Sequence, residues 1–274
     1  MTGSETLLKV EGLRISFGDA VPVRNVNFTV PKHGRVALVG ESGCGKSLTA
    51  LSLWKDHPEV RLAYVFQNPM ESLNPVMKIG AQIHEVSKEI TREEIVELLR
   101  RTGLEDPDRV YSSYPCRLSG GQCQRAMIAM ALAAKPDLLV ADEPTTALDV
   151  TTQREVLELI DSLAAETGMA VLLITHNLGL VAGRMDAVNV MYAGEIVESG
   201  PVEEVLANPR HPYTQGLLAA VPRLDLPKDA PLADIPGTVP PPWNWPCGCA
   251  FHPRCPKARP SCSSADFTVC PEIR

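Results

Sequence analysis

The sequence predicts an α/β fold built around a mostly parallel β-sheet. Compact apolar strands are expected at 35–39 and 137–141, and the strand expected at 169–175 shows no polar alternation, as is typical of strands covered on both faces. Segments with helical periodicity lie between these strands. This alternation of strands and helices is typical of the α/β class.

The remaining strands and helices are predicted from the same patterns and from glycines that mark where an element ends. Further strands are expected at 7–10, 13–17, 23–30 and 61–66. Helices are expected at 47–54, 77–101, 122–134 and 151–166. After Gly200 the composition changes to two short helical segments, a proline-rich linker at 222–246 and a cysteine cluster. We therefore expect one large domain at 1–200 and an extension at 201–274.

Composition excludes several classes of protein. The chain has 274 residues, of which 45% are hydrophobic, so a sizeable core needs no disulfides. A net charge of −7 argues against a general nucleic-acid binder. The longest uninterrupted apolar run, 126–134, is far shorter than the roughly 20 residues of a membrane span. We expect a soluble chain whose membrane role, if any, comes through partner subunits.

A phosphate-binding loop is predicted between the strand at 35–39 and the helix at 47–54. The run Gly40-Glu41-Ser42-Gly43-Cys44-Gly45-Lys46-Ser47 fits G-x-x-x-x-G-K-[ST] in the strand–loop–helix context that this motif requires. Backbone N–H groups up to Leu48 would surround phosphates, Lys46 would neutralise their charge, and Ser47 would ligate Mg²⁺.

Two acids and a histidine follow later strands. Asp142 and Glu143 directly follow the strand at 137–141, where the first would hold Mg²⁺ and the second would act as general base on water. His176 directly follows the strand at 169–175, at the end of a parallel strand where ligands bind. Capping acids and a structural histidine are the alternatives.

The run Leu118-Ser119-Gly120-Gly121-Gln122 precedes the helix at 122–134. Its glycines allow close backbone approach to a phosphate, and the helix N-terminus favours an anion. Together with the phosphate loop and the acidic strand end, this run resembles the signature of the ATP-binding cassette (ABC) ATPases. The resemblance implies a RecA-like nucleotide-binding domain with a helical signature subdomain at about 68–134.

Further site residues are implied only by this resemblance. Gln67 resembles the glutamine that reaches Mg²⁺ and the attacking water, and Asp149, in Ala147-Leu148-Asp149, resembles the loop that contacts the opposite subunit. Phe17 resembles the aromatic that stacks on adenine, with a plain core position as its alternative. His176 would contact the γ-phosphate. The signature would close over ATP held by a second ATPase subunit.

Local sequence narrows the resemblance to the dipeptide/oligopeptide/nickel importer ATPases, of the D type. The matching segments are Gln67-Asn68-Pro69 with Ser72-Leu73-Asn74-Pro75, His211-Pro212-Tyr213-Thr214, and the tail from Ile235 to Cys255. One departure is the short segment from Lys46 to Gln67, where relatives usually have a few dozen more residues.

The cysteines divide into two groups. Cys249, Cys255, Cys262 and Cys270 are spaced more widely than the close pairs of structural zinc sites, which favours a [4Fe–4S] cluster over zinc or no metal. Cys247 is expected to be a spare thiol, and Cys44, Cys116 and Cys123 are expected to pack as small apolar side chains.

The resemblance implies an ATP- and Mg²⁺-dependent subunit that powers a peptide importer at the cytoplasmic face of the membrane. Its expected partners are a second ATPase subunit, two transmembrane permease subunits and, indirectly, an extracellular solute-binding protein, without nucleic acid. The alternatives are an importer of nickel or another small solute, and a soluble ABC ATPase unrelated to transport.

Overall fold

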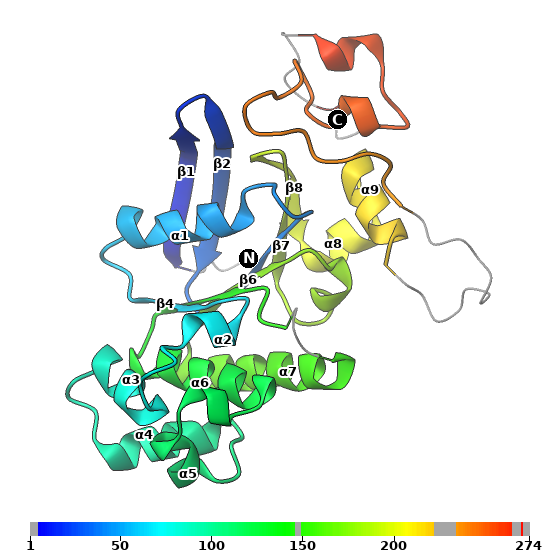
Figure 1. The fold of residues 1–274 in the computed structure, drawn as a ribbon. Coiled ribbons are helices and arrows are strands. Elements are labelled where there is room, and N and C mark those ends of the chain that lie inside the picture. Colours follow the sequence, from blue (N-terminus) through cyan, green and yellow to red (C-terminus); the bar gives the residue numbers. More distant parts are fainter. Residues whose placement is uncertain (1–4, 146–148, 222–233, 265–269, 271–274) are drawn as a thin grey trace. The chain divides into compact units, whose positions relative to one another are not determined.

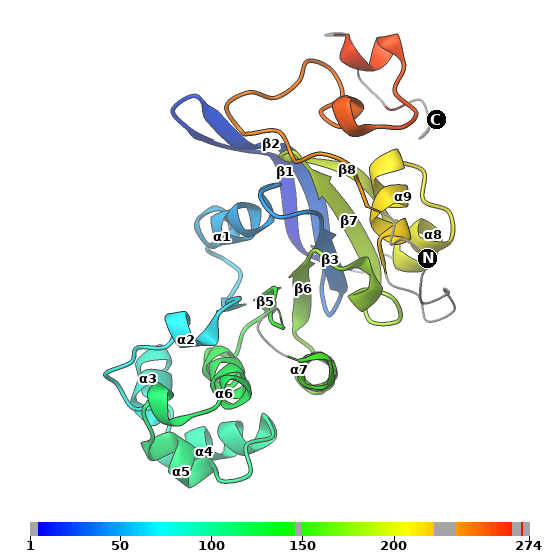
Figure 2. The same ribbon diagram turned by 45° about the vertical axis from the view of Figure 1, so that its right-hand side comes forward.

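The computed structural model describes residues 5–145, 149–221, 234–264 and 270. The chain forms two compact units, Met1–His57 with Ile174–Arg274, and Pro58–Leu173. Figures 1 and 2 show the elements of both units, which are described separately below. Among the described residues, no helix is both long enough and apolar enough to cross a membrane.

The first unit contains five neighbouring strands in the order β1-β2-β8-β7-β3. Their bounds are β1 Thr6–Phe17, β2 Ala20–Pro31, β3 Arg35–Val39, β7 Ala187–Tyr192 and β8 Glu195–Pro201. The pairs β1–β2 and β7–β8 are antiparallel, whereas β2–β8 and β3–β7 are parallel. The sheet is therefore mixed, because each tight hairpin places an antiparallel pair beside the parallel strands.

Two strand predictions in this unit are corrected. The two short strands expected at 7–10 and 13–17 are one strand, β1, whose pairing to β2 shifts register between Val10 and Leu13 and again further on. Such irregularities interrupt the alternation of side chains, so one bent strand looks like two in the sequence. Strands β7 and β8 were not expected at all, and they join through a turn with positive φ at Ala193 and Gly194.

The helices of the first unit are short. They are α1 Lys46–Asp56, α8 Val202–Ala207 and α9 Pro212–Ala219, with single 3₁₀ turns η2 Leu178–Leu180, η3 His252–Arg254 and η4 Pro260–Ser263. Helix α1 contacts β1 and β2, and α8 contacts β7 and β8. The chain leaves α1 through a short connection at 57–61, and Trp54 in this helix is 54% exposed.

The second unit contains the strand order β6-β5-β4 and a cluster of helices. The strands are β4 Leu62–Val65, β5 Leu138–Asp142 and β6 Ala170–Thr175, of which the last two residues belong to the first unit. The helices are α2 Pro69–Ser72, α3 Ile79–Val86, α4 Arg92–Arg101, α5 Pro107–Ser112, the 3₁₀ turn η1 Pro115–Arg117, α6 Gly120–Ala133 and α7 Val150–Thr167. Figure 1 shows α3 to α6 gathered together.

The helix expected at 77–101 is wrong, because the chain breaks there into α3 and α4. Thr91 caps α4 by accepting from the Glu94 N–H, while the Glu94 carboxylate accepts from the Thr91 N–H. This reciprocal capping box starts a new helix in the middle of the periodic segment. The apolar faces still meet in one core, which includes Ile79, Ile83 and Leu99.

The carboxy-terminal segment of the first unit, residues 234–264, packs against the preceding elements through aromatic side chains. The Phe251 ring lies 5.1 Å from Tyr192 and 5.3 Å from Tyr213, and Tyr192 lies 4.6 Å from Tyr213. His211 is buried beside them, where its Nδ1 accepts from the Tyr213 N–H and caps α9. Burial lowers the pKa of His211 from its usual 6.5 to about 4, although the Glu198 carboxylate acts in the opposite direction.

We predict that the first unit loses stability as the pH falls from about 6.5 to about 4. The folded state has the lower His211 pKa, so the unfolded chain takes up the proton first and folding is opposed throughout this window. The contribution is on the order of 3 kcal/mol, present in full above the unfolded pKa. Thermal unfolding between pH 7.5 and pH 4.5 measures it. His211→Asn, which keeps a capping oxygen, should flatten the profile, whereas the exposed His84→Gln should not; equal slopes in both would contradict the assignment.

Candidate functional site

The phosphate loop joins β3 to α1, and two of its glycines are required by its geometry. A Cβ on Gly40 would lie 2.1 Å from the Met191 carbonyl oxygen, and Gly45 adopts a φ of 101° immediately before the first residue of α1. The Gly40 N–H donates to the Thr175 carbonyl at 3.3 Å, which ties the loop to the end of β6. No residue with a side chain could follow this path without strain.

Lys46 lies within the curve of this loop. Its Nζ is buried and donates to the carbonyl oxygens of Gly40 at 2.7 Å and Glu41 at 2.9 Å. Ser47 and Leu48 continue the first turn of α1, where backbone N–H groups have no helical partner of their own. An ammonium group and free amide donors together form a site for anionic oxygens.

The other loop residues take different roles. The Cys44 side chain is fully buried, and this burial raises the pKa of its thiol, so Cys44 contributes packing together with its backbone. Ser42 and Gly43 are exposed. Cys123 is also buried, but Cys116 is exposed, and its expected packing position is therefore wrong.

The acidic strand end is arranged by the pairing of β4 with β5. The two strands run parallel with Val65 opposite Ala141, so Gln67 and Glu143 both come two residues after this pair. The Gln67 Nε2 donates to a Glu143 carboxylate oxygen at 3.1 Å. Glu143 itself has a φ of 44°, a left-handed conformation that is uncommon for residues with a side chain.

Tyr64 holds Asp142 and was not identified from the sequence. Its hydroxyl donates to the Asp142 carboxylate at 2.7 Å, and both side chains are buried. Burial and the neighbouring Asp142 charge raise the pKa of Tyr64, so its hydroxyl remains a donor at neutral pH. The only available signal was a polar-tipped aromatic in an otherwise apolar strand. The Asp142 carboxylate is a hard oxygen ligand of the kind that Mg²⁺ prefers.

The signature residues form the start of α6. Ser119 Oγ accepts from the Gln122 N–H at 3.2 Å, and the Gln122 side-chain oxygen accepts from the Ser119 N–H at 3.1 Å. Ser119 and Gly120 are exposed, whereas Leu118 is buried in the helical core. A Cβ at Gly120 would meet no atom within 4 Å, so the outer side of this turn is open to another molecule.

Three further predicted residues have the following positions. Asp149 caps α7 by accepting from the N–H groups of Thr151 and Thr152, and its neighbours 147–148 lie outside the described residues. Phe17 is 63% exposed, which rules out its alternative as a core residue. His176 is exposed immediately after β6.

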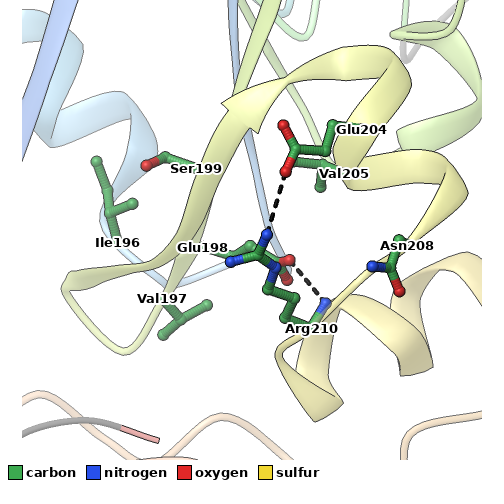
Figure 3. A pocket seen from close by; sticks show the side chains of 8 residues that line it. All are labelled: Ile196, Val197, Glu198, Ser199, Glu204, Val205, Asn208 and Arg210. Atoms are coloured by element: carbon green, nitrogen blue, oxygen red, sulfur yellow. Dashed lines mark hydrogen bonds and ion pairs between the residues drawn. The ribbon is translucent and has the colours of Figure 1, made fainter. Parts of the chain in front are cut away.

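A cavity of about 250 Å³ lies elsewhere in the first unit, between β8 and α8 (Figure 3). Its charged groups already have structural partners. Arg210 pairs with Glu204 at 3.2 Å, and the Glu198 carboxylate accepts from the N–H groups of Arg210 and His211. These charged groups of the cavity therefore take part in structural contacts.

The four cysteines selected from the sequence line one small cavity. Cys249, Cys255, Cys262 and Cys270 surround it with His211, Phe251 and His252. Burial raises the pKa of Cys249 and of Cys255, which favours neutral thiols. Within the described ranges, no group of three or more His, Cys, Asp or Glu side chains is arranged to hold a metal ion. The [4Fe–4S] prediction is therefore not supported by a formed metal site among these residues.

Comparison with protein families gives two matches along the chain. Residues 23–146 match the family described as ABC transporter, and residues 197–262 match the family described as oligopeptide/dipeptide transporter, C-terminal region. The first match contains the phosphate loop, the signature and the acidic strand end.

Curated relatives cover nearly the whole chain. A peptide import ATP-binding protein of Brucella ovis is 45% identical over 312 residues, which span 95% of this chain and 92% of the relative. Another, from Brucella abortus, is 44% identical over 296 residues, or 93% and 89% of the two chains. Both alignments are longer than this chain, so the relatives contain residues that it lacks.

Solved structures agree with the fold. The cbiO1 subunit from Clostridium perfringens, part of an ABC transporter complex, has a TM-score of 0.65 at 25% identity and covers 74% of this chain and 92% of its own. The ATP-binding cassette MJ0796, solved as a dimer bound to ADP and Pi, has a TM-score of 0.60 at 25% identity and covers 71% and 98%.

We predict that Tyr64→Phe lowers the apparent affinity for Mg²⁺ in nucleotide hydrolysis without abolishing the activity. Removing the hydroxyl leaves the buried Asp142 carboxylate less firmly oriented, so the Mg²⁺ concentration for half-maximal hydrolysis should rise about tenfold. A magnesium titration of activity measures this. The exposed Tyr114→Phe is the matched control, and identical titration curves for both variants would show that Tyr64 does not orient the carboxylate.

Proposed function

Because this chain belongs to the family of ABC transporter ATP-binding subunits, we propose that it hydrolyses ATP to power the import of peptides across a membrane. The observation that carries the proposal is the presence, in one chain, of the ATP-binding cassette at 23–146 and the oligopeptide/dipeptide transporter region at 197–262. The relatives named for peptide import cover both regions.

The proposed chemistry uses the residues placed above. The phosphate loop and Lys46 would bind the β- and γ-phosphates, and Ser47 and Asp142 are the residues that would ligate Mg²⁺. Glu143 accepts the proton of the attacking water as general base. Gln67 orients this carboxylate through its 3.1 Å hydrogen bond, and His176 contacts the γ-phosphate.

The proposed assembly follows from the exposed signature. Ser119 and Gly120 face outward at the N-terminus of α6, which suits an ATP held by a second ATPase subunit. Asp149 would contact that subunit, and Phe17, exposed at the end of β1, would stack on adenine. Two permease subunits would place the chain at the cytoplasmic face of the membrane, with the solute-binding protein on the other side.

Two alternative functions can be distinguished from peptide import by identifying the partners of the chain. An importer of nickel or another small solute would have the same ATPase and a different cargo. A soluble ABC ATPase would have no permease partners. The cargo is selected by the permease and the solute-binding protein, so the partners decide among these functions.

We predict that the chain co-purifies with two polytopic membrane proteins and a second ATPase, and that this complex hydrolyses ATP in response to a peptide-loaded binding protein. Only soluble partners, or stimulation by nickel alone, would contradict peptide import.

In the same complex, we predict that the Glu143→Gln variant binds ATP normally and loses at least about a hundredfold in turnover, because it lacks the general base. Unchanged turnover in the variant would refute the role of Glu143.

The cysteine-lined cavity is a separate proposal. Four thiols are soft ligands suited to an iron–sulfur cluster, with zinc as the alternative. The support is that one cavity is lined by all four side chains and that all eight cysteines are free of disulfides. A cluster would stabilise this part of the chain when bound.

We predict that protein purified without oxygen is brown and contains about four irons per chain. Metal analysis and the visible spectrum measure this, and Cys262→Ser should abolish both signals. Cys116→Ser, which changes an exposed thiol outside the cavity, is the control. Colourless protein that contains zinc or no metal would overturn the cluster.

A further inference from the structure

The phosphate loop is held by a residue from the far end of the chain. The Arg254 guanidinium makes two parallel hydrogen bonds to the Glu41 carboxylate, from Nη1 at 2.8 Å and from Nη2 at 3.0 Å. Arg254 is 8% exposed, and 213 positions separate the two residues. Paired forks of this kind fix direction as well as distance.

Arg254 is itself held rigidly by the carboxy-terminal segment. Its remaining donors bind backbone carbonyls at 235–237, with distances from 2.8 to 3.3 Å. The guanidinium also lies over the Tyr192 ring, 5.8 Å from the ring centre. Burial alone would lower the pKa of Arg254, but its bonds to Glu41 and Tyr192 raise it, so the charge is well satisfied.

A second contact from the same region reaches the backbone of Glu41. The Glu41 N–H donates to the Tyr213 hydroxyl at 2.8 Å, so both the side chain and the amide of Glu41 are fixed. The carbonyl of Glu41 in turn accepts from Lys46 Nζ at 2.9 Å. A continuous set of hydrogen bonds therefore runs from Arg254 through Glu41 to the lysine that would bind phosphate.

We infer that Arg254 is a positioning residue for nucleotide binding, which fixes the phosphate loop through Glu41 in the conformation that receives ATP. The inference deepens the proposed function and rests on ATP binding at this loop. Arg254 lies within residues 197–262, so the region that matches the oligopeptide/dipeptide transporter family would stabilise the phosphate loop of the cassette. Without it the loop would have to be ordered at the expense of binding free energy.

The test measures MgATP binding to the full chain for the wild type, Arg254→Gln and Arg210→Gln. Arg210 also pairs with a glutamate in the first unit, but within the described residues its side chain forms no hydrogen bond or ion pair with the phosphate loop. We expect Arg254→Gln to raise the Kd about tenfold, equal to about 1.4 kcal/mol, and Arg210→Gln to leave it unchanged. In the assembled transporter, the KM for ATP should rise while kcat at saturating ATP stays within about twofold.

A double variant separates positioning from simple packing of the tail. If Arg254 acts through Glu41, then Arg254→Gln should add little to the Kd of Glu41→Gln, whereas independent effects would add. Equal Kd values for wild type and Arg254→Gln, or additive effects in the double variant, would overturn the inference. Should Arg254→Gln fail to fold, Arg254→Lys keeps the charge without the fork, and its Kd must still rise. A wild type that binds no ATP would instead refute the proposed function.

Discussion

The parallel pairing of β4 with β5 is the constraint on which the arrangement of the candidate catalytic side chains after these strands depends. Because Val65 lies opposite Ala141, the residues that follow each strand leave the sheet at the same edge. Gln67 and Glu143 are therefore brought within 3.1 Å although 76 positions separate them. The same pairing buries Tyr64 beside Asp142. A shift of the register by one residue would turn these side chains to the opposite face and dissolve both contacts.

The sequence was most informative where chemistry requires particular residues in a fixed local order. The phosphate loop from Gly40 to Ser47 and the signature from Leu118 to Gln122 are contiguous, so their conformation follows from glycines and helix caps within a few residues. Family membership and the α/β fold, both expected from these motifs, are confirmed by the comparisons.

What the sequence did not predict depends on contacts between distant segments. Strands β7 and β8 carry no motif, and β8 is only half-buried, so its pattern is weak. The break between α3 and α4 depends on one capping box inside a helical pattern. Tyr64 and Arg254 are defined only by their partners, Asp142 and Glu41, which are far away in the chain. Periodicity cannot identify such pairs, because it reports burial and not the identity of a neighbour.

The left-handed backbone of Glu143 sets stability against activity at a single residue. Glu143, at a φ of 44°, is strained by about 1 kcal/mol, whereas glycine or asparagine adopts this conformation more readily. A change to either would relax the turn after β5 and make the fold more stable, yet it would remove the carboxylate. Selection for thermal stability alone would therefore favour variants that have lost the Glu143 carboxylate and with it the activity. Screens for stabilised variants should keep position 143 unchanged.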